Sequence, residues 1–182
     1  MNAASPTDGQ PPVFEIASFP LPVVQRLCRA GLDLFVQDED GASLLHQFDV
    51  AEPRTYDWIV RRFAERGLID QATHEGITAL SGAVKFGDVR AVRSLLAAGA
   101  SPNTVARIER YGGSRLSIPR QVMLAMVDDE ADPVGVRLEI LSLLERHGLR
   151  IDASVREDVE PFLEDADPRI IRWFEHRMSS GP

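Results

Sequence analysis

The chain has 182 residues, of which 44% are hydrophobic, and this length and composition suit one domain with a continuous core. Its formal charge of −8 argues against nucleic-acid binding, because that affinity comes from neutralising phosphates. No apolar run reaches the roughly 18 residues that a membrane span needs. We therefore expect neither a nucleic acid nor a membrane as partner.

Two residue counts bear on compartment and source. Cys28 is the only cysteine, which excludes an internal disulfide and a cysteine-based metal cluster and fits a reducing, cytoplasmic location. At an apolar position of a helix, this thiol is predicted to be buried and inert. Lys85 is the only lysine among twenty basic residues, and this arginine bias indicates a GC-rich, bacterial genome.

The chain starts with MNAASPTDGQPP, which lacks the basic segment and apolar block of a secretory signal. We predict that residues 1–12 form a flexible leader and that residues 13–178 form a single domain.

Four helix-like segments each end at a glycine, namely Gly31, Gly67, Gly99 and Gly148, and these glycines are 36, 32 and 49 residues apart. Apolar residues stand four, seven and eight positions before every glycine, which places them on one face of a helix. Glycine ends a helix at low cost because it readily adopts left-handed backbone angles. One such helix cannot bury its stripe alone, so we predict stacked copies in a solenoid. The stripe residues are Val23, Val24, Leu27, Ile59, Val60, Phe63, Ala91, Val92, Leu95, Ile140, Leu141 and Leu144.

A second pattern precedes two of these helices. It reads GASLLH from Gly41 and GITALS from Gly76, and the two glycines are 35 residues apart. Each hexapeptide supplies a turn, a hydroxyl residue suited to capping a helix, and a leucine for the core. We expect a first helix after each turn, followed by the glycine-terminated helix.

The stretch from Gly76 to Asn103 resembles an ankyrin repeat. The family pattern joins a Gly-x-Thr-Pro-Leu-His turn, two antiparallel helices and Gly-Ala-Asp-x-Asn, and Ala79 and Ser81 depart from its Pro and His. The resemblance covers about residues 20–152 and implies an all-α ankyrin-repeat solenoid with short hairpin fingers. The matching residues are Thr78, Leu80, Ala83, Gly87, Val92, Leu95, Leu96, Gly99, Ala100 and Asn103.

By this resemblance the chain divides into a half-repeat at 20–34, repeats at about 35–70, 71–103 and 104–152, and a C-terminal cap at 153–178. Pro53 is expected to lengthen the link between the two helices of the second unit. The extra length of the 104–152 unit is expected in an enlarged hairpin finger and in a loop before Pro133. The cap is expected to pack back through Ile170, Ile171, Phe174 and Trp173.

The sequence contains no pattern that points to catalysis. It lacks a phosphate-binding loop and a nucleophile elbow, and its four histidines lack metal-ligand spacing. The resemblance gives His46 a structural role, in which its ring ties neighbouring turns by hydrogen bonds. We therefore predict a protein that is not an enzyme and that needs no cofactor or metal.

In ankyrin proteins, partners dock on the concave face formed by the fingers and first helices, and the same positions are our candidates here. Tyr111 and Arg110 are the strongest candidates for partner contact, because Tyr and Arg dominate interface hot spots. Three alternatives stay open: Tyr111 packs on its own hairpin, Phe86 fills a local gap, and the acids of 38–40 form only a solvated loop. The finger candidates are Asp38, Glu39, Asp40, His74, Glu75, Arg107, Glu109, Arg110 and Tyr111, and the first-helix candidates are Gln47, Lys85 and Phe86.

These observations favour a non-enzymatic module that is a monomer by itself and binds another protein, for which the acidic finger at 38–40 would suit a basic surface. In a GC-rich bacterium, such a protein is predicted to be an immunity protein that neutralises its cognate toxin by direct binding. The alternatives are an effector delivered into host cells, with residues 1–12 as its export signal, and a general cytosolic adaptor.

Overall fold

The computed structural model describes residues 12–47, 52–108, 113–127 and 132–179. These residues are mostly helical and include one small two-stranded antiparallel sheet. Within them, every helix is too short or too polar to cross a lipid bilayer. The longer helices are α1 (Leu21–Arg29), α2 (Pro53–Glu65), α4 (Val89–Ala97), α6 (Pro133–Arg146), α7 (Ala153–Leu163) and α8 (Pro168–Ser179). The shorter elements are η1 (Pro12–Ser18), η2 (Leu44–His46), α3 (Ala79–Lys85), β1 (Val105–Ile108), β2 (Ser114–Ser117) and α5 (Ile118–Met123).

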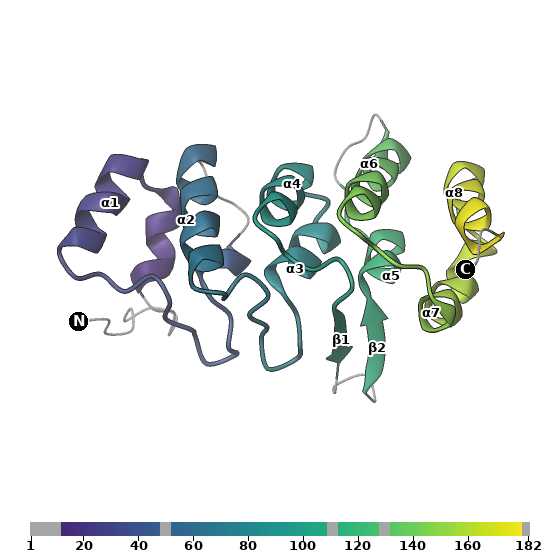
Figure 1. Ribbon diagram of the computed structural model, residues 1–182, viewed down its shortest axis with the longest axis horizontal. Coiled ribbons are helices and arrows are strands. Elements are labelled where there is room, and N and C mark those ends of the chain that lie inside the picture. The colour runs from purple at the N-terminus through teal and green to yellow at the C-terminus, as the bar shows by residue number, and fades with distance from the viewer. Residues whose placement is uncertain (1–11, 48–51, 109–112, 128–131, 180–182) are drawn as a thin grey trace.

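The helices stack in one elongated row of two layers (Figure 1). One layer runs α1, α2, α4, α6 and α8, and each of these helices contacts the next. The other layer runs η1, η2, α3, α5 and α7, again with neighbour contacting neighbour. The core lies between the layers and continues along the row, as the repeated apolar stripe predicts.

Each of the four glycine-terminated helices ends in the same way. All four glycines have positive φ angles: 97° at Gly31, 69° at Gly67, 96° at Gly99 and 90° at Gly148. In every case the residue after the glycine donates its N–H to the carbonyl five residues earlier, over 2.9–3.1 Å. This is the hydrogen-bond pattern of a Schellman C-cap, and it confirms the predicted helix ends.

Polar side chains after two of these glycines join one unit to the next. Asp70 Oδ1 accepts the Ser101 N–H at 2.9 Å. Asn103 donates from Nδ2 to the Gly148 carbonyl at 3.0 Å and accepts the Arg150 N–H at 2.9 Å. These side chains, three residues after Gly67 and four residues after Gly99, fix the spacing of successive units by hydrogen bonds to backbone.

The first unit differs from the prediction. It is not a bare second helix, because η1 precedes α1 and buries Val13, Phe14 and Ile16. The stripe of α1 is also incompletely covered: Val23 is 44% exposed and Leu27 is half-buried, whereas the other stripe residues are buried. Among the described residues, α1 is the first helix of its layer, so its outer side lacks the helix neighbour that the later stripes have (Figure 1).

Four local expectations need correction. In the described residues, the first helix expected in the second unit is only the short η2. Pro53 does not lie in the link between helices but begins α2, because a residue without an N–H suits the first turn of a helix. Cys28 is half-buried, since it lies on the thinly covered α1. In the cap, Ile170, Trp173 and Phe174 are buried as expected, but Ile171 is only half-buried.

Candidate protein-binding surface

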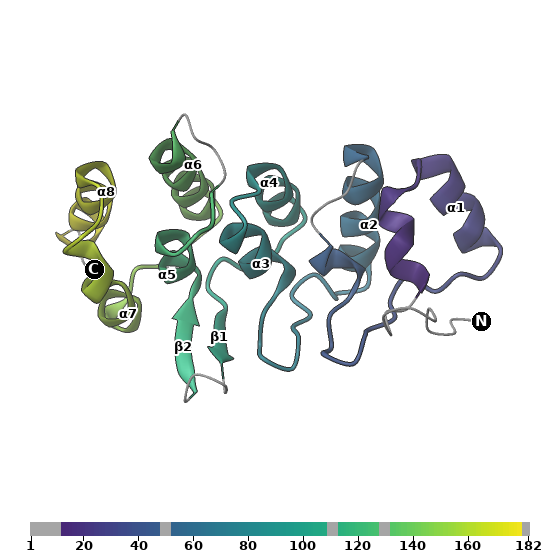
Figure 2. The same ribbon diagram turned by 180° about the vertical axis from the view of Figure 1, so that it is seen from behind.

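Three turns project from the same edge of the row and lie next to one another (Figure 2). The first closes at the Gln37–Ser43 bridge and the second at the Ala72–Thr78 bridge. The third is the hairpin of β1 and β2, in which Val105 pairs with Ser117 and Ile108 with Ser114. We call these three turns the finger stack, and the hairpin confirms the enlarged finger that the sequence predicted.

Backbone hydrogen bonds connect each finger to the next. The His74 N–H donates to the Asp40 carbonyl at 2.9 Å, and the Arg107 N–H donates to the Glu75 carbonyl at 3.2 Å. The first bond joins residues 34 positions apart in the sequence, and the second joins residues 32 positions apart. The described finger candidates therefore form one continuous strip.

Glycine permits this close approach. Gly41 and Gly76 have φ angles of 79° and 77° and occupy equivalent places in the first two fingers. A β-carbon at Gly41 would lie 3.0 Å from the His74 ring, and one at Gly76 would lie 3.4 Å from the Ala106 backbone. Gly41 thus serves both the turn and the contact with the neighbouring finger, whereas 3.4 Å is an ordinary contact distance and Gly76 serves the turn.

His46 ties the first finger to the second, as expected. Its Nδ1 accepts the Ser43 N–H at 3.1 Å, which leaves the proton on Nε2 for donation to the Ile77 carbonyl, also at 3.1 Å. Burial lowers the pKa of His46 below its ordinary value, although its hydrogen bonds with backbone oppose the shift. The ring is therefore held neutral and structural.

The three acids of the first finger have different roles. Asp38 Oδ1 accepts the N–H groups of Asp40 at 3.0 Å and Ala42 at 2.8 Å, so this carboxylate shapes the turn. The side chains of Glu39 and Asp40 are exposed. Only the latter two are thus presented for contact with a partner.

The remaining finger candidates fall into two groups. His74 and Arg107 are exposed on the second and third fingers, and Glu75 is half-buried beside them. Glu109, Arg110 and Tyr111 lie outside the described residues, so the two most heavily weighted candidates stay predictions.

The first-helix candidates lie apart from the finger stack. Gln47 is half-buried after η2, whereas Lys85 and Phe86 stand at the end of α3 that is remote from its finger. Phe86 is 52% exposed, which excludes the gap-filling alternative. The structure adds two residues here that the sequence reasoning missed: Leu124 and Met126 are 48% and 52% exposed, and the Met126 N–H donates to the Lys85 carbonyl at 2.8 Å. Their position directly after α5 in the apolar run VMLAMV was the available signal.

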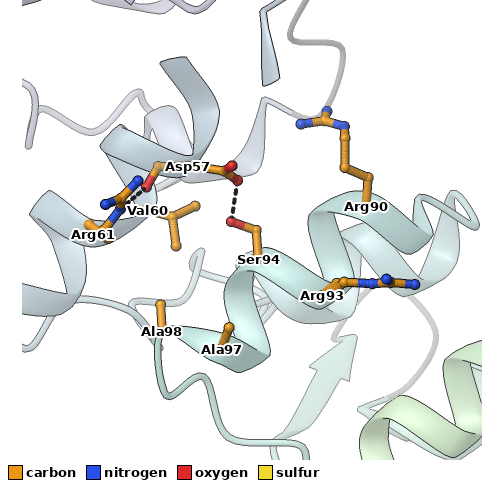
Figure 3. Close-up of a pocket in the computed structure, with 8 residues that line it drawn as sticks. All are labelled: Asp57, Val60, Arg61, Arg90, Arg93, Ser94, Ala97 and Ala98. Atoms are coloured by element: carbon orange, nitrogen blue, oxygen red, sulfur yellow. Dashed lines mark hydrogen bonds between the residues drawn. The ribbon is translucent and has the colours of Figure 1, made fainter. Parts of the chain in front are cut away.

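A groove of about 390 Å³ lies between α2 and α4, away from the fingers (Figure 3). Asp57 Oδ1 accepts a 2.7 Å hydrogen bond from Ser94 across it. Figure 3 shows Arg90 and Arg93 pointing in different directions away from this pair, while Arg61 bonds the Asp57 carbonyl at 3.2 Å. The arginines therefore do not converge on one anion, and the Asp57–Ser94 pair serves to join the helices.

Among the described residues, no three His, Cys, Asp or Glu side chains lie together as a metal site would require. Burial is the main cause that raises the pKa of the Cys28 thiol above its ordinary value, which makes it a weak nucleophile. No protein-family model matches the chain, and a search of curated proteins finds no significant match. The finger stack, with its aligned turns and exposed charges, is the candidate functional surface.

Proposed function

We propose that the chain is an ankyrin-type solenoid that binds another protein through its finger stack, and that it is a bacterial immunity protein acting on a cognate toxin. The observation that carries the binding proposal is the pair of finger-to-finger hydrogen bonds, Asp40 to His74 and Glu75 to Arg107. They align exposed side chains from units distant in sequence into one strip. A strip ordered before binding loses little conformational entropy on association.

The ankyrin assignment rests on agreement at several levels. The sequence pattern from Gly76 to Asn103 has its expected counterparts in the fold: Thr78 caps α3, with its side chain accepting the Ser81 N–H at 3.2 Å, and Gly99 ends α4. His46 makes the turn-to-turn contact that the resemblance implies. These features support stacked repeats of one kind.

The charge of the strip supports a basic partner. Glu39 and Asp40 are exposed on the first finger, and the half-buried Glu75 lies on the second. Exposed acids of this kind speed encounter with a basic surface and select against acidic proteins. A toxin with a basic active-site rim has the matching chemistry.

A non-enzymatic role is part of the same proposal. Inhibition by occlusion needs only a rigid, complementary surface, and no group of the strip has to change its protonation state. The exposed side chains of Phe86, Leu124 and Met126 offer apolar contact area apart from the charged strip, which a large partner would cover together with the fingers.

The test is affinity capture from the native organism with three forms of the protein as bait. We expect the wild type to retain a partner stoichiometrically, and E39K together with D40K to lose it, as quantified by mass spectrometry. The matched control carries E157K and E160K, the same charge change on exposed sites of α7, and should retain the partner. A partner retained equally by all three baits would show that the strip is not the binding surface.

The toxin proposal needs a second arm. Expression of the captured partner alone should arrest growth, and co-expression of the wild type, but not of the E39K and D40K form, should restore it. A partner that does not arrest growth would remove the immunity function and leave the effector and adaptor alternatives.

A further inference from the structure

A second groove, of about 450 Å³, lies between α1 and α2. Its lining includes two aromatic rings, Phe35 and Trp58, together with Leu32 and the half-buried Cys28. Phe35 is anchored from below, because its ring centroid lies 4.9 Å from that of the buried Phe63. These side chains form the apolar and aromatic floor of a groove whose other lining residues are mostly polar.

Three exposed arginines line the same groove: Arg29 from α1, and Arg62 and Arg66 from the end of α2. Arg62 is paired with Glu65 at 2.7 Å. No acidic side chain among the described residues lies within ion-pair distance of Arg29 or Arg66, and Asp33, which also lines the groove, accepts the Phe35 N–H at 2.9 Å. A local excess of positive charge therefore remains on a protein whose formal charge is −8.

Two of these guanidinium groups lie within cation–π distance of the aromatic rings. The Arg66 Cζ lies 4.3 Å from the centroid of Phe35, and the Arg62 Cζ lies 5.7 Å from the ring of Trp58. A guanidinium held over a ring by a cation–π contact still has N–H donors for a carboxylate. The aromatic floor and the basic rim are thus parts of one arrangement.

We infer that this groove binds an acidic segment of a protein partner, with carboxylates on Arg29 and Arg66 and an apolar or aromatic side chain on the floor between them. Charge complementarity selects this occupant, because the groove is basic where the rest of the molecule is acidic. The site lies on α1 and α2 and not on the finger stack, so it goes beyond the proposed function and admits a second partner.

The probe is a short fluorescein-labelled peptide in which glutamates surround two phenylalanines, and its binding is measured by fluorescence anisotropy. We expect R29E together with R66E to weaken binding at least about tenfold, since both carboxylate partners become repulsive. The control carries R146E and R172E, the same charge change at exposed sites on α6 and α8, and should bind like the wild type. Peptides with lysine replacing glutamate, or serine replacing phenylalanine, should bind much more weakly.

The only cysteine supplies an independent measurement on the unaltered protein. Because Cys28 lines the groove, bound peptide should slow its alkylation by iodoacetamide several-fold. The E39K and D40K form should show the same protection, which separates this site from the finger stack.

Several results would overturn the inference. They are absence of acidic-peptide binding at millimolar concentration, equal loss of binding in the control pair, and unchanged Cys28 alkylation in the presence of saturating peptide. Equally tight binding of the lysine or serine peptide would do the same. Tighter, arginine-dependent binding of a DNA oligonucleotide would identify a nucleic-acid site instead.

Discussion

Single side chains decide how firmly each helix is held in the row. Leu95 is fully buried between the two layers, whereas Leu124 is 48% exposed after α5. The apolar spacing before each glycine predicts the first of these correctly, because the helical period alone places Leu95 on the stripe. It cannot predict that Val23 is exposed, since that depends on α1 standing first in its layer of the described helices.

L95A should lower the free energy of unfolding by about 2–5 kcal/mol, because it removes a fully buried side chain and leaves a cavity. L124A, the same change at an exposed site, should lower it by less than about 0.5 kcal/mol. Urea denaturation followed by circular dichroism measures both. Similar values for the two variants would show that the stripe is not the core.

His46 predicts a pH dependence of stability. Its pKa is lower in the folded protein than the ordinary value of 6.5, so the unfolded chain binds the proton more readily. The stability linked to this residue is therefore complete above about pH 6.5 and is lost as the pH falls toward the lowered folded pKa. Protonation also removes the Nδ1 acceptor of the Ser43 N–H.

The measurement is the urea midpoint at pH 7 and at pH 5, for the wild type and for H46Q. We expect the wild type to lose more stability between the two pH values than H46Q, which has no titrating group at this site. Equal losses would mean that His46 is not held neutral by the fold.

At the scale of elements, turns and caps define the units. The sequence predicts the four helix ends well, because glycine with a left-handed backbone is a local signal that does not depend on packing. It predicts η1 and η2 poorly, since such short helical segments form only where neighbouring layers cover them. The sequence also could not predict the hydrogen bonds from Asp70 and Asn103 to the next unit, because they join residues 31 or more positions apart.

Gly99 and Gly41 both have positive φ angles, so substituting each by alanine distinguishes the cost of backbone strain from the cost of crowding against a neighbouring finger. At Gly99 a β-carbon would meet nothing within 4 Å, so G99A should lower stability only through the left-handed backbone, by about 1–2 kcal/mol. At Gly41 the same strain is joined by crowding against His74. G41A should therefore be the more destabilising change in urea denaturation, and an equal or milder effect would contradict the described finger contact.

One carboxylate joins the C-terminal cap to the unit before it. Asp158 on α7 accepts the Ser117 N–H at 2.9 Å and pairs with Arg120 at 2.9 Å, and its side chain is only 10% exposed. D158A should lower stability by about 1–3 kcal/mol, because it leaves the Ser117 N–H without this acceptor and removes the ion pair with Arg120. E157A changes the exposed neighbour on the same helix and should have little effect. Hydrogen exchange should accelerate in α7 and α8 of D158A first, and a uniform change along the row would refute this role.

At the scale of the whole molecule, charge is distributed unevenly along and across the row. The segments 20–30, 52–66 and 88–98, which contain α1, α2 and α4, hold eight arginines and four acids. The segment 152–164, which contains α7, holds five acids and one arginine. Net charge alone indicated one acidic surface and a basic partner, whereas the fold separates an acidic finger edge from a basic groove. The sequence could not predict this separation, because it depends on which helices share a layer.

For the candidate surface as well, the sequence could not predict features that depend on how distant segments pack together. The sequence singled out fingers by their position in the repeat, and the structure brings together those candidates that it describes. It could not show that Asp38 is committed to its turn, or that Met126 bonds to Lys85, the neighbour of Phe86, because these facts depend on local hydrogen bonds and on contacts between units.

Hydrogen exchange of the protein with and without its captured partner tests the central claim most directly. We predict that the partner slows exchange in the finger stack, at residues 38–43, 72–78 and 105–108, and near Phe86. Exchange in the outer parts of α4 and α6 should change little. Protection confined to those outer helices, with the fingers unchanged, would contradict the proposal that the finger stack is the binding surface.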